Sequence, residues 1–360
     1  MAGGIGRIAG IAVAGLAALG VGGYFVLPSS AAKSQSFSIA RPSAVVFARL
    51  SSTPANTQIA PGVTVTKVRS AANNQVVEEL SYADGGTGLA TYTVRPEGDG
   101  SHVDVKIERN LGANPMDRIN GFSGAPVATA AAAFFPAVST DLNALPNASF
   151  SGLHYSVVQV AAQPFFYIQN CSPTDPESVE SVVQDALVAV RAVMAVKHLE
   201  IAGPPIAVEP TVQNNQYCYQ IGYPYTGTPP RVLAVGTAGT TPAGTALKVV
   251  YKGGEENVIH DVYDPLDALL AAAHLDDPTT RADDWPTYEV YHDDPTAQGG
   301  SHDREIYYVT RGDISALTAI APPTPDAPAA AATPAAATTT EAPAATTTAT
   351  TTATTTATTQ

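Results

Sequence analysis

Two short segments decide the fold of the C-terminal half of this chain: 288-Tyr-Glu-Val-Tyr-291 and 304-Arg-Glu-Ile-Tyr-Tyr-Val-309. Both consist mainly of β-branched and aromatic residues, which favour β-strands. Each also carries one glutamate, Glu289 or Glu305, beside aromatic residues. Carboxylates are uncommon inside strands of this kind, so these two are candidates for a functional role.

Side chains alternate between the faces of a strand, so Glu289 shares a face with Tyr291 and Glu305 shares one with Tyr307. A carboxylate on a partly dry aromatic surface must find a cation, accept hydrogen bonds or take up a proton. A bound cationic ligand would satisfy this requirement. A salt bridge, for which Arg304 is a nearby candidate, or a position facing solvent would satisfy it as well.

The two segments end the second copy of an internal near-repeat, in which a strand is followed by a helix and then by further strands. The first copy is expected to comprise strand 156–168, helix 175–199 and strand 216–225. The second is expected to begin with strand 231–235 and to continue with a helix over 262–275. The repeat predicts an α+β fold in which each copy sends its helix to one face and the strands pair across a pseudo-two-fold axis.

Three segments, 163–168, 288–295 and 304–309, resemble successive hallmarks of the gyrase-inhibitor-like (GyrI-like) small-molecule-binding domain. This is the effector-binding domain of AraC-type and multidrug-responsive regulators, and the SOUL haem-binding fold is related to it. The resemblance implies a pocket for a small hydrophobic or cationic molecule over residues 153–313, with a glutamate as counter-charge. In some members of the family that glutamate serves as an acid/base residue in hydrolysis.

Aromatic residues are concentrated in this half, since all but three of the 15 tyrosines (Tyr24, Tyr82 and Tyr92) lie between Tyr155 and Tyr308. Aromatic faces in a cleft suit flat, apolar or cationic ligands through stacking and cation–π contacts, although such rings can also be ordinary core. The candidate ligand-binding residues are Glu289, Glu305, Tyr167, Tyr219, Tyr223, Tyr263, Trp285, Tyr291 and Tyr307.

Residues 36–150 have a different pattern, of strand, helix, antiparallel strands and closing helix. The strands are expected at 36–39, 64–69, 75–82, 88–95 and 102–108, the first helix at 44–50, and helical structure from 115 to 145, interrupted by Pro126 and Pro136. The order is that of a helix-grip fold, and the turn at 95–100 and segment 110–115 resemble the polyketide cyclase/START-like (SRPBCC) family. The short interval before Thr64 leaves little room for the extra hairpin usual in that family, which implies an abbreviated fold and a shallower cavity.

The chain termini have compositions unlike the folded segments. Residues 8–27 are apolar or glycine and follow a single basic residue, Arg7. They are long enough to span a membrane, or they form a signal peptide cleaved near Ser30-Ala31-Ala32. Residues 1–32 are therefore an anchor or a signal peptide, and the protein is expected at the bacterial inner membrane facing the periplasm, or exported. Residues 320–360 are rich in Ala, Pro and Thr and are expected to be disordered.

The cysteines and histidines predict neither a metal site nor a cofactor. Cys171 and Cys218 either form a disulfide in an oxidising compartment or remain buried thiols. The loop residues His292-Asp293-Asp294 and His302-Asp303 lack distinctive ligand spacing.

The chain carries 18 Lys and Arg against 32 Asp and Glu, a net charge of −14, which disfavours nucleic-acid binding. The leading hypothesis is a membrane-tethered, exported small-molecule-binding protein without a nucleic-acid partner. One alternative is a hydrolase that uses Glu305 or Glu289 as acid/base. Another is a structural or partner-binding envelope protein, and no particular protein partner is indicated.

Overall fold

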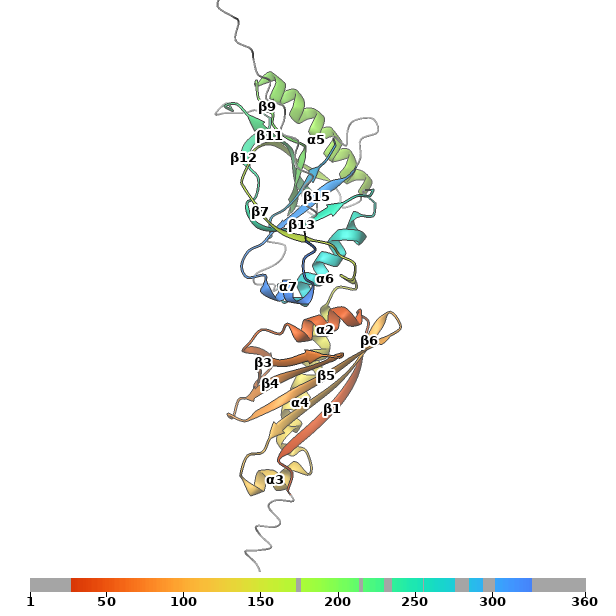
Figure 1. Ribbon diagram of the computed structural model, residues 1–360, viewed down its shortest axis with the longest axis vertical. Coiled ribbons are helices and arrows are strands. Elements are labelled where there is room, and N and C mark those ends of the chain that lie inside the picture. The colour runs from red at the N-terminus through yellow and green to blue at the C-terminus, as the bar shows by residue number, and fades with distance from the viewer. Residues whose placement is uncertain are drawn as a thin grey trace, which may run out of the picture. The chain divides into compact units, whose positions relative to one another are not determined.

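The computed structural model describes residues 27–172, 176–213, 216–229, 235–254, 256–275, 285–293 and 302–325. Within these residues the chain is an α+β protein with two antiparallel sheets, one of which is curled into a half-barrel (Figure 1). The smaller sheet belongs to the N-terminal half of the chain, and the larger, curled sheet to the C-terminal half.

The N-terminal half contains a six-stranded antiparallel sheet with the strand order β1-β6-β5-β4-β3-β2. Its strands are β1 (Ser30–Ile39), β2 (Thr57–Ala60), β3 (Val63–Ala72), β4 (Gln75–Tyr82), β5 (Thr87–Glu97) and β6 (Gly100–Asn110). The strand predicted over 102–108 lies within β6, where the alternate residues Val103, Val105 and Ile107 are buried. The interval before Thr64, which was expected to leave little room for a hairpin, holds the four-residue strand β2, which pairs with β3.

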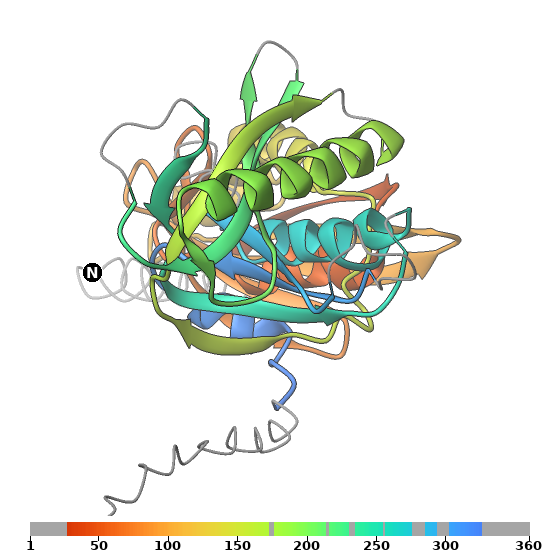
Figure 2. The same ribbon diagram turned by 90° about the horizontal axis from the view of Figure 1, so that it is seen from above.

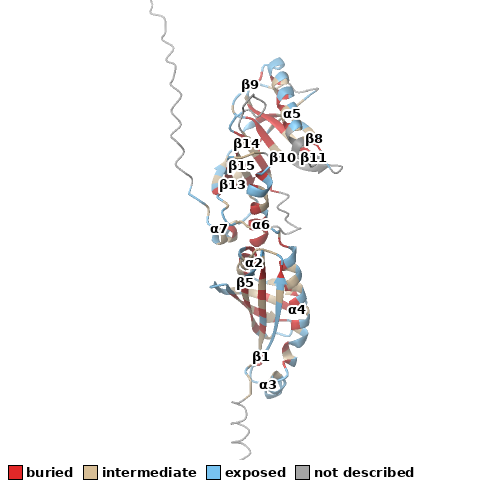
Figure 3. Ribbon diagram, turned by 90° about the vertical axis from the view of Figure 1, so that its right-hand side faces the viewer, coloured by how far each residue is buried: buried red, intermediate tan, exposed pale blue. Residues whose placement is uncertain are grey.

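In the described part of this half, three helices accompany the sheet: α2 (Ser43–Ser51), α3 (Pro115–Gly121) and α4 (Ala125–Ala144). Buried and exposed residues alternate along α4, so one side of the helix is buried (Figure 3). The expectation that Pro136 would interrupt this helix was wrong, because α4 continues through it. Its neighbours Phe134 and Phe135 are buried in the core of this half, and this apolar burial offsets the local cost of proline.

The described residues of the C-terminal half form nine strands, eight of them in the order β12-β8-β11-β10-β14-β15-β13-β7, while β9 pairs with β11. They are β7 (Ser156–Val160), β8 (Pro164–Ser172), β9 (Glu200–Ile201), β10 (Ile206–Gln213), β11 (Gln216–Thr226), β12 (Thr237–Thr240), β13 (Gly244–Tyr251), β14 (Thr287–Tyr291) and β15 (Arg304–Val309). The strand predicted over 156–168 is divided into β7 and β8. The one predicted over 231–235 lies almost wholly outside the described residues, and β13 was not predicted.

The helices of this half are α5 (Pro176–Val196), the π-helical turn η1 (Ile259–Tyr263), α6 (Asp264–Ala272) and α7 (Ser315–Ile320). Figures 1 and 2 show α5 and α6 on one side of the curled sheet. We call this side the helix face. It carries buried residues such as Ile221 against α5 and Ile306 against α6. The opposite side, which we call the inner face, has its own apolar cluster, including Phe165, Ile206 and Tyr288.

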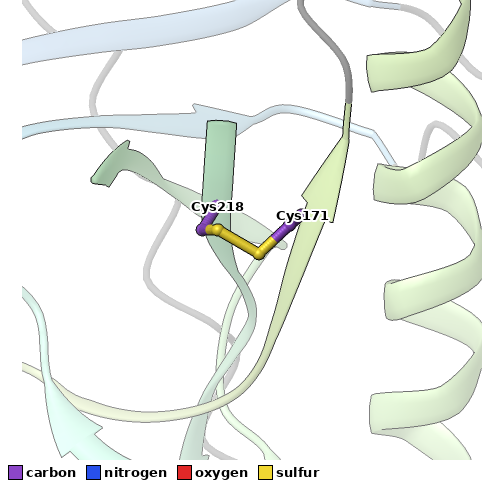
Figure 4. The surroundings of a disulfide bond; sticks show 2 residues. All are labelled: Cys171 and Cys218. Carbon is purple, nitrogen blue, oxygen red and sulfur yellow. A yellow bond between two sulfur atoms is a disulfide. The ribbon is translucent and has the colours of Figure 1, made fainter. Parts of the chain in front are cut away.

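The cysteine alternatives are resolved in favour of a disulfide between Cys171 of β8 and Cys218 of β11 (Figure 4). The two residues are directly opposed in the register of these neighbouring strands.

The termini fall only partly within the described residues. The apolar segment predicted as an anchor or signal peptide lies outside them except for its last residue, and the tail lies outside them beyond residue 325. Residues predicted to begin the tail are folded, because the Thr324 amide donates to the Tyr155 carbonyl. Among the described helices none is both long and apolar enough to cross a membrane by itself, although α3 and α4, joined by a bend of 59°, pass such a test together.

Candidate functional site

The inner face carries two stacked pairs of aromatic rings. The Tyr288 and Tyr307 rings lie 4.8 Å apart with an angle of 9° between their planes. On β8 the rings of Phe165 and Tyr167 lie 5.3 Å apart at 21°. All four side chains belong to or pack against one apolar cluster, in which Phe165 and Tyr288 are buried and Tyr167 and Tyr307 provide the partly exposed surface.

Glu305 supplies the negative charge beside this surface. One carboxylate oxygen lies 2.8 Å from Lys248 Nζ, and the other accepts a hydrogen bond from the Tyr307 hydroxyl. His292 Nε2 lies 3.8 Å from the same carboxylate. Burial by itself would raise the pKa of Glu305, but the hydrogen bonds from Lys248 and Tyr307 hold that pKa below its usual value.

The ionised state of Glu305 decides what this surface can do. A carboxyl with a lowered pKa is a poor proton donor near neutral pH, so the geometry favours a role as counter-charge over one as general acid. Burial, followed by the negative charge of Glu305, raises the pKa of Tyr288 to about 12, which keeps its phenol neutral. The surface therefore combines neutral aromatic rings with one fixed anion and one cation, Lys248.

Glu289 lies on the helix face. Its two oxygens accept hydrogen bonds from the hydroxyl groups of Tyr263 and Tyr291, the latter at 2.9 Å. Arg304 Nη1 lies 3.3 Å from Glu289 Oε2 and donates to the Tyr291 hydroxyl at 3.2 Å. The predicted sharing of a face with Tyr291 is confirmed, and Arg304 pairs with Glu289 rather than with Glu305.

This second cluster is a buried ion pair with aromatic walls. The Arg304 side chain is fully buried, and its guanidinium lies 5.6 Å from the Tyr251 ring centroid and 5.4 Å from that of Tyr291. The side chain of Glu289 is 13% exposed. Because Tyr263, Tyr291 and Arg304 all contact the Glu289 carboxylate, this residue is a structural counter-charge for Arg304.

The remaining predicted ligand residues contact the helices. Tyr223 is buried and Tyr219 partly buried against α5, whereas Trp285 is buried in the cluster under α6. Of the nine predicted residues, the inner face holds Glu305, Tyr307 and Tyr167. Their role in ligand binding stays a prediction.

Sequence reasoning missed three members of the inner face: Phe165, Tyr288 and Lys248. The sequence contained a signal for Phe165 only, since it lies two residues before Tyr167 and so shares its face. The positions of Tyr288 and Lys248 follow only from strand pairing, because both are opposite Tyr307 on the strands that flank β15.

Within the described residues, no group of three or more His, Cys, Asp or Glu side chains could hold a metal ion. Residues 294–301 and the other residues outside the described ranges were not included, so the absence of a metal remains a prediction. The N-terminal half has an open pocket between β1 and α4, lined by Lys33, Ser34, Gln35, Ala128, Ala131, Ala132, Phe135 and Pro136.

No protein-family model and no curated protein matches the chain. Distant structural matches exist to effector-binding, GyrI-like folds and to SRPBCC/AHSA1-like cyclase folds. EcmrR in its DNA complex matches with 15% identity and a TM-score of 0.34, over 43% of this chain and 56% of EcmrR.

Two further matches are a hydrolase encoded by lin2189 from Listeria innocua and the AHSA1-like protein from Aeromonas hydrophila. The first has 12% identity and a TM-score of 0.29 over 43% of this chain and 90% of the hydrolase. The second has 13% identity and a TM-score of 0.18 over 30% of this chain and 92% of that protein. At these TM-scores the likenesses carry no functional argument, and the proposal below depends on this chain's own side chains.

Proposed function

We propose that this protein binds a flat hydrophobic molecule on the inner face of its curled sheet, with a preference for cationic ligands. The observation that supports this most directly is Glu305, which is held ionised beside the stacked rings of Tyr288 and Tyr307. Aromatic faces attract flat and cationic groups, and a partly desolvated carboxylate adds a charge-specific term.

Lys248 occupies the position beside Glu305 that a cationic ligand would take. Its ammonium group neutralises Glu305 and lies 5.9 Å from the Tyr307 ring centroid, where a ligand cation would also be attracted. The side chains of Lys248 and Glu305 are 20% and 22% exposed, so the pair can be reached from solvent. An arriving cation would displace the flexible lysine and take over its partner.

A matched pair of ligands tests the proposal: N-methylacridinium, which is permanently cationic, and acridine, which is neutral at mildly alkaline pH. Calorimetric titration of the full chain should show saturable binding of both, with the cation tighter. Glu305→Gln should weaken binding of the cation by about tenfold, equivalent to about 1.4 kcal/mol, and change acridine binding little. Lys248→Met should have the opposite effect on the cation, because it removes the competing ammonium group.

Glu289→Gln is the matched control, since Glu289 is committed to Arg304 on the helix face. If it weakened cation binding as much as Glu305→Gln while the protein remained folded, the inner face would not be the binding surface. Absence of binding by either ligand to folded wild type would contradict the proposal and favour the structural, partner-binding alternative.

We also propose that the apolar segment 8–27 tethers the exported protein to a membrane. Support comes from the 20-residue apolar length, the preceding Arg7 and the start of the fold at Ser30, directly after this segment. Expression of the full chain in a bacterial host, followed by alkaline extraction of membranes, tests it. Retention in the membrane pellet is expected, and release of full-length protein into the supernatant would contradict it.

A further inference from the structure

Helix α3 presents an apolar face to solvent. Met116, Ile119 and Phe122, the last being the C-cap residue, are 62%, 50% and 71% exposed, and no residue of the helix is buried. Their spacing of three residues places them along one side of the helical segment. We call these three residues the α3 patch.

The α3 patch differs from the other exposed apolar positions of the described residues. The remaining large hydrophobic residues of this kind are distributed among several elements of the C-terminal half, at Val157, Val188, Val196, Ile201, Val235, Val250 and Ile259. Single exposed apolar residues need no explanation, whereas a cluster indicates a surface that contacts something apolar.

The position of α3 indicates what covers the patch. Gly121, the last residue of α3, lies next to Pro28, since a Cβ atom added at Gly121 would be 3.1 Å from the Pro28 ring. The Leu111 amide also donates to the Ser29 carbonyl at 3.0 Å. The chain therefore enters the fold beside α3, and Figure 1 shows α3 close to the start of β1. The segment immediately before this entry point is the apolar run 8–27.

Basic residues next to the patch fit the same environment. Arg118 lies within α3. The exposed Lys33 of β1 lies close to Gly124, the residue that precedes α4. Long basic side chains beside apolar residues can place their charge at lipid headgroups while their stems remain in apolar surroundings.

We propose that the α3 patch inserts into the interfacial layer of the membrane to which segment 8–27 attaches the protein. The lipid surface is the occupant because the predicted anchor ends two residues before β1 and next to α3. This inference depends on the proposed tether and adds a second contact, which would restrict the orientation of the N-terminal half at the membrane.

Tryptophan fluorescence in proteoliposomes tests the inference. The full-length variant Phe122→Trp would be reconstituted into phosphatidylcholine–phosphatidylglycerol vesicles with brominated or unmodified acyl chains. The control is Val196→Trp on α5, which is exposed to nearly the same extent, 70%, but lies outside the patch. The wild-type signal of Trp285 is subtracted in each case.

We expect blue-shifted emission and quenching by brominated lipid for the Phe122→Trp variant only. If the protein floats with the vesicles but neither introduced tryptophan is quenched, the patch inference is overturned and the tether stands. A blue shift without quenching by brominated lipid also overturns it, in favour of a protein partner. If the full chain does not float with the vesicles, both the tether and the patch inference are overturned.

Discussion

Arg304 and Glu289 form an ion pair inside the C-terminal half, with 3.3 Å between Nη1 and Oε2 and with the arginine side chain fully buried. The pair connects neighbouring strands, because Arg304 begins β15 and Glu289 lies in β14. Removing two charges from water is costly, and their mutual attraction offsets this cost only while both partners are present.

Glu289→Gln should therefore destabilise the protein by about 3–5 kcal/mol, because it leaves the buried Arg304 charge without its counter-charge. Urea unfolding followed by Trp285 fluorescence measures the change. Trp285 is suited to this purpose, since it is buried in the cluster under α6.

Glu305→Gln is the matched comparison, because Glu305 forms a partly exposed pair with Lys248. Loss of this pair in Glu305→Gln should lower the free energy of unfolding by no more than about 1 kcal/mol. Equal effects of the two substitutions would contradict the assignment of Glu289 to a structural role and of Glu305 to the accessible surface.

Much of the fold could be predicted from alternation and helix signals. The strand predicted at 75–82 and the helix at 44–50 agree with β4 and α2 to within a residue. The four-residue β2 was missed because a strand this short is stabilised by its pairing with β3 rather than by its own composition. Pro136 misled the prediction because tertiary burial outweighed a local preference.

The site could be predicted only in part, because the sequence does not show which strand face the helices cover. Glu289 and Glu305 have the same local pattern, each with a tyrosine two residues later. The register pairs Glu289 with Ile306 and Val290 with Glu305, which sends the two carboxylates to opposite faces. Local pattern therefore identified both residues, and strand pairing separated their roles.

Glu78 should make stability depend on pH. Burial is the largest influence on this carboxyl and raises its pKa from 4.5 to about 7, while the Tyr92 hydroxyl donates to it at 2.8 Å. Between these pH values the folded state binds more protons than the unfolded state. The stabilising contribution is therefore complete below about pH 4.5 and is lost as the pH rises through 7.

Glu78→Gln should flatten the slope of the free energy of unfolding against pH. It should also make the protein more stable than wild type at alkaline pH, by up to about 3 kcal/mol. Urea unfolding across the pH range measures it. The neighbouring Glu79, which is partly exposed and lies 3.4 Å from Lys67, provides the control Glu79→Gln. A steep slope that persists in Glu78→Gln would contradict the assignment.

Reduction of the disulfide should lower stability by about 2–4 kcal/mol, because the bond closes a loop between residues separated by 47 positions. The double variant Cys171→Ala/Cys218→Ala should unfold at the same urea concentration as reduced wild type. Thiol titration of the unfolded, unreduced protein should find no free cysteine. Two titratable thiols, or unfolding that does not respond to reductant, would contradict the pairing.

His274 should contribute a pH dependence of the opposite sign. Burial, followed by the positive charge of Arg49, lowers its pKa from 6.5 to about 4, and the neutral ring donates from Nε2 to the Arg49 carbonyl at 2.8 Å. The unfolded state binds the extra proton first, so stability is lost as the pH falls from about 6.5 to 4.

His274→Asn should lower the free energy of unfolding by about 1 kcal/mol near neutral pH and reduce its dependence on pH in acid, the acid slope. Asparagine tolerates the backbone φ of +58° but does not titrate in this range. Thermal unfolding at several pH values measures both effects. His198→Asn is the control, since His198 has a similar φ of +56° at an exposed position and should leave the slope unchanged. An equal loss of the acid slope in both variants would mean that protonation of His274 is not what weakens the protein in acid.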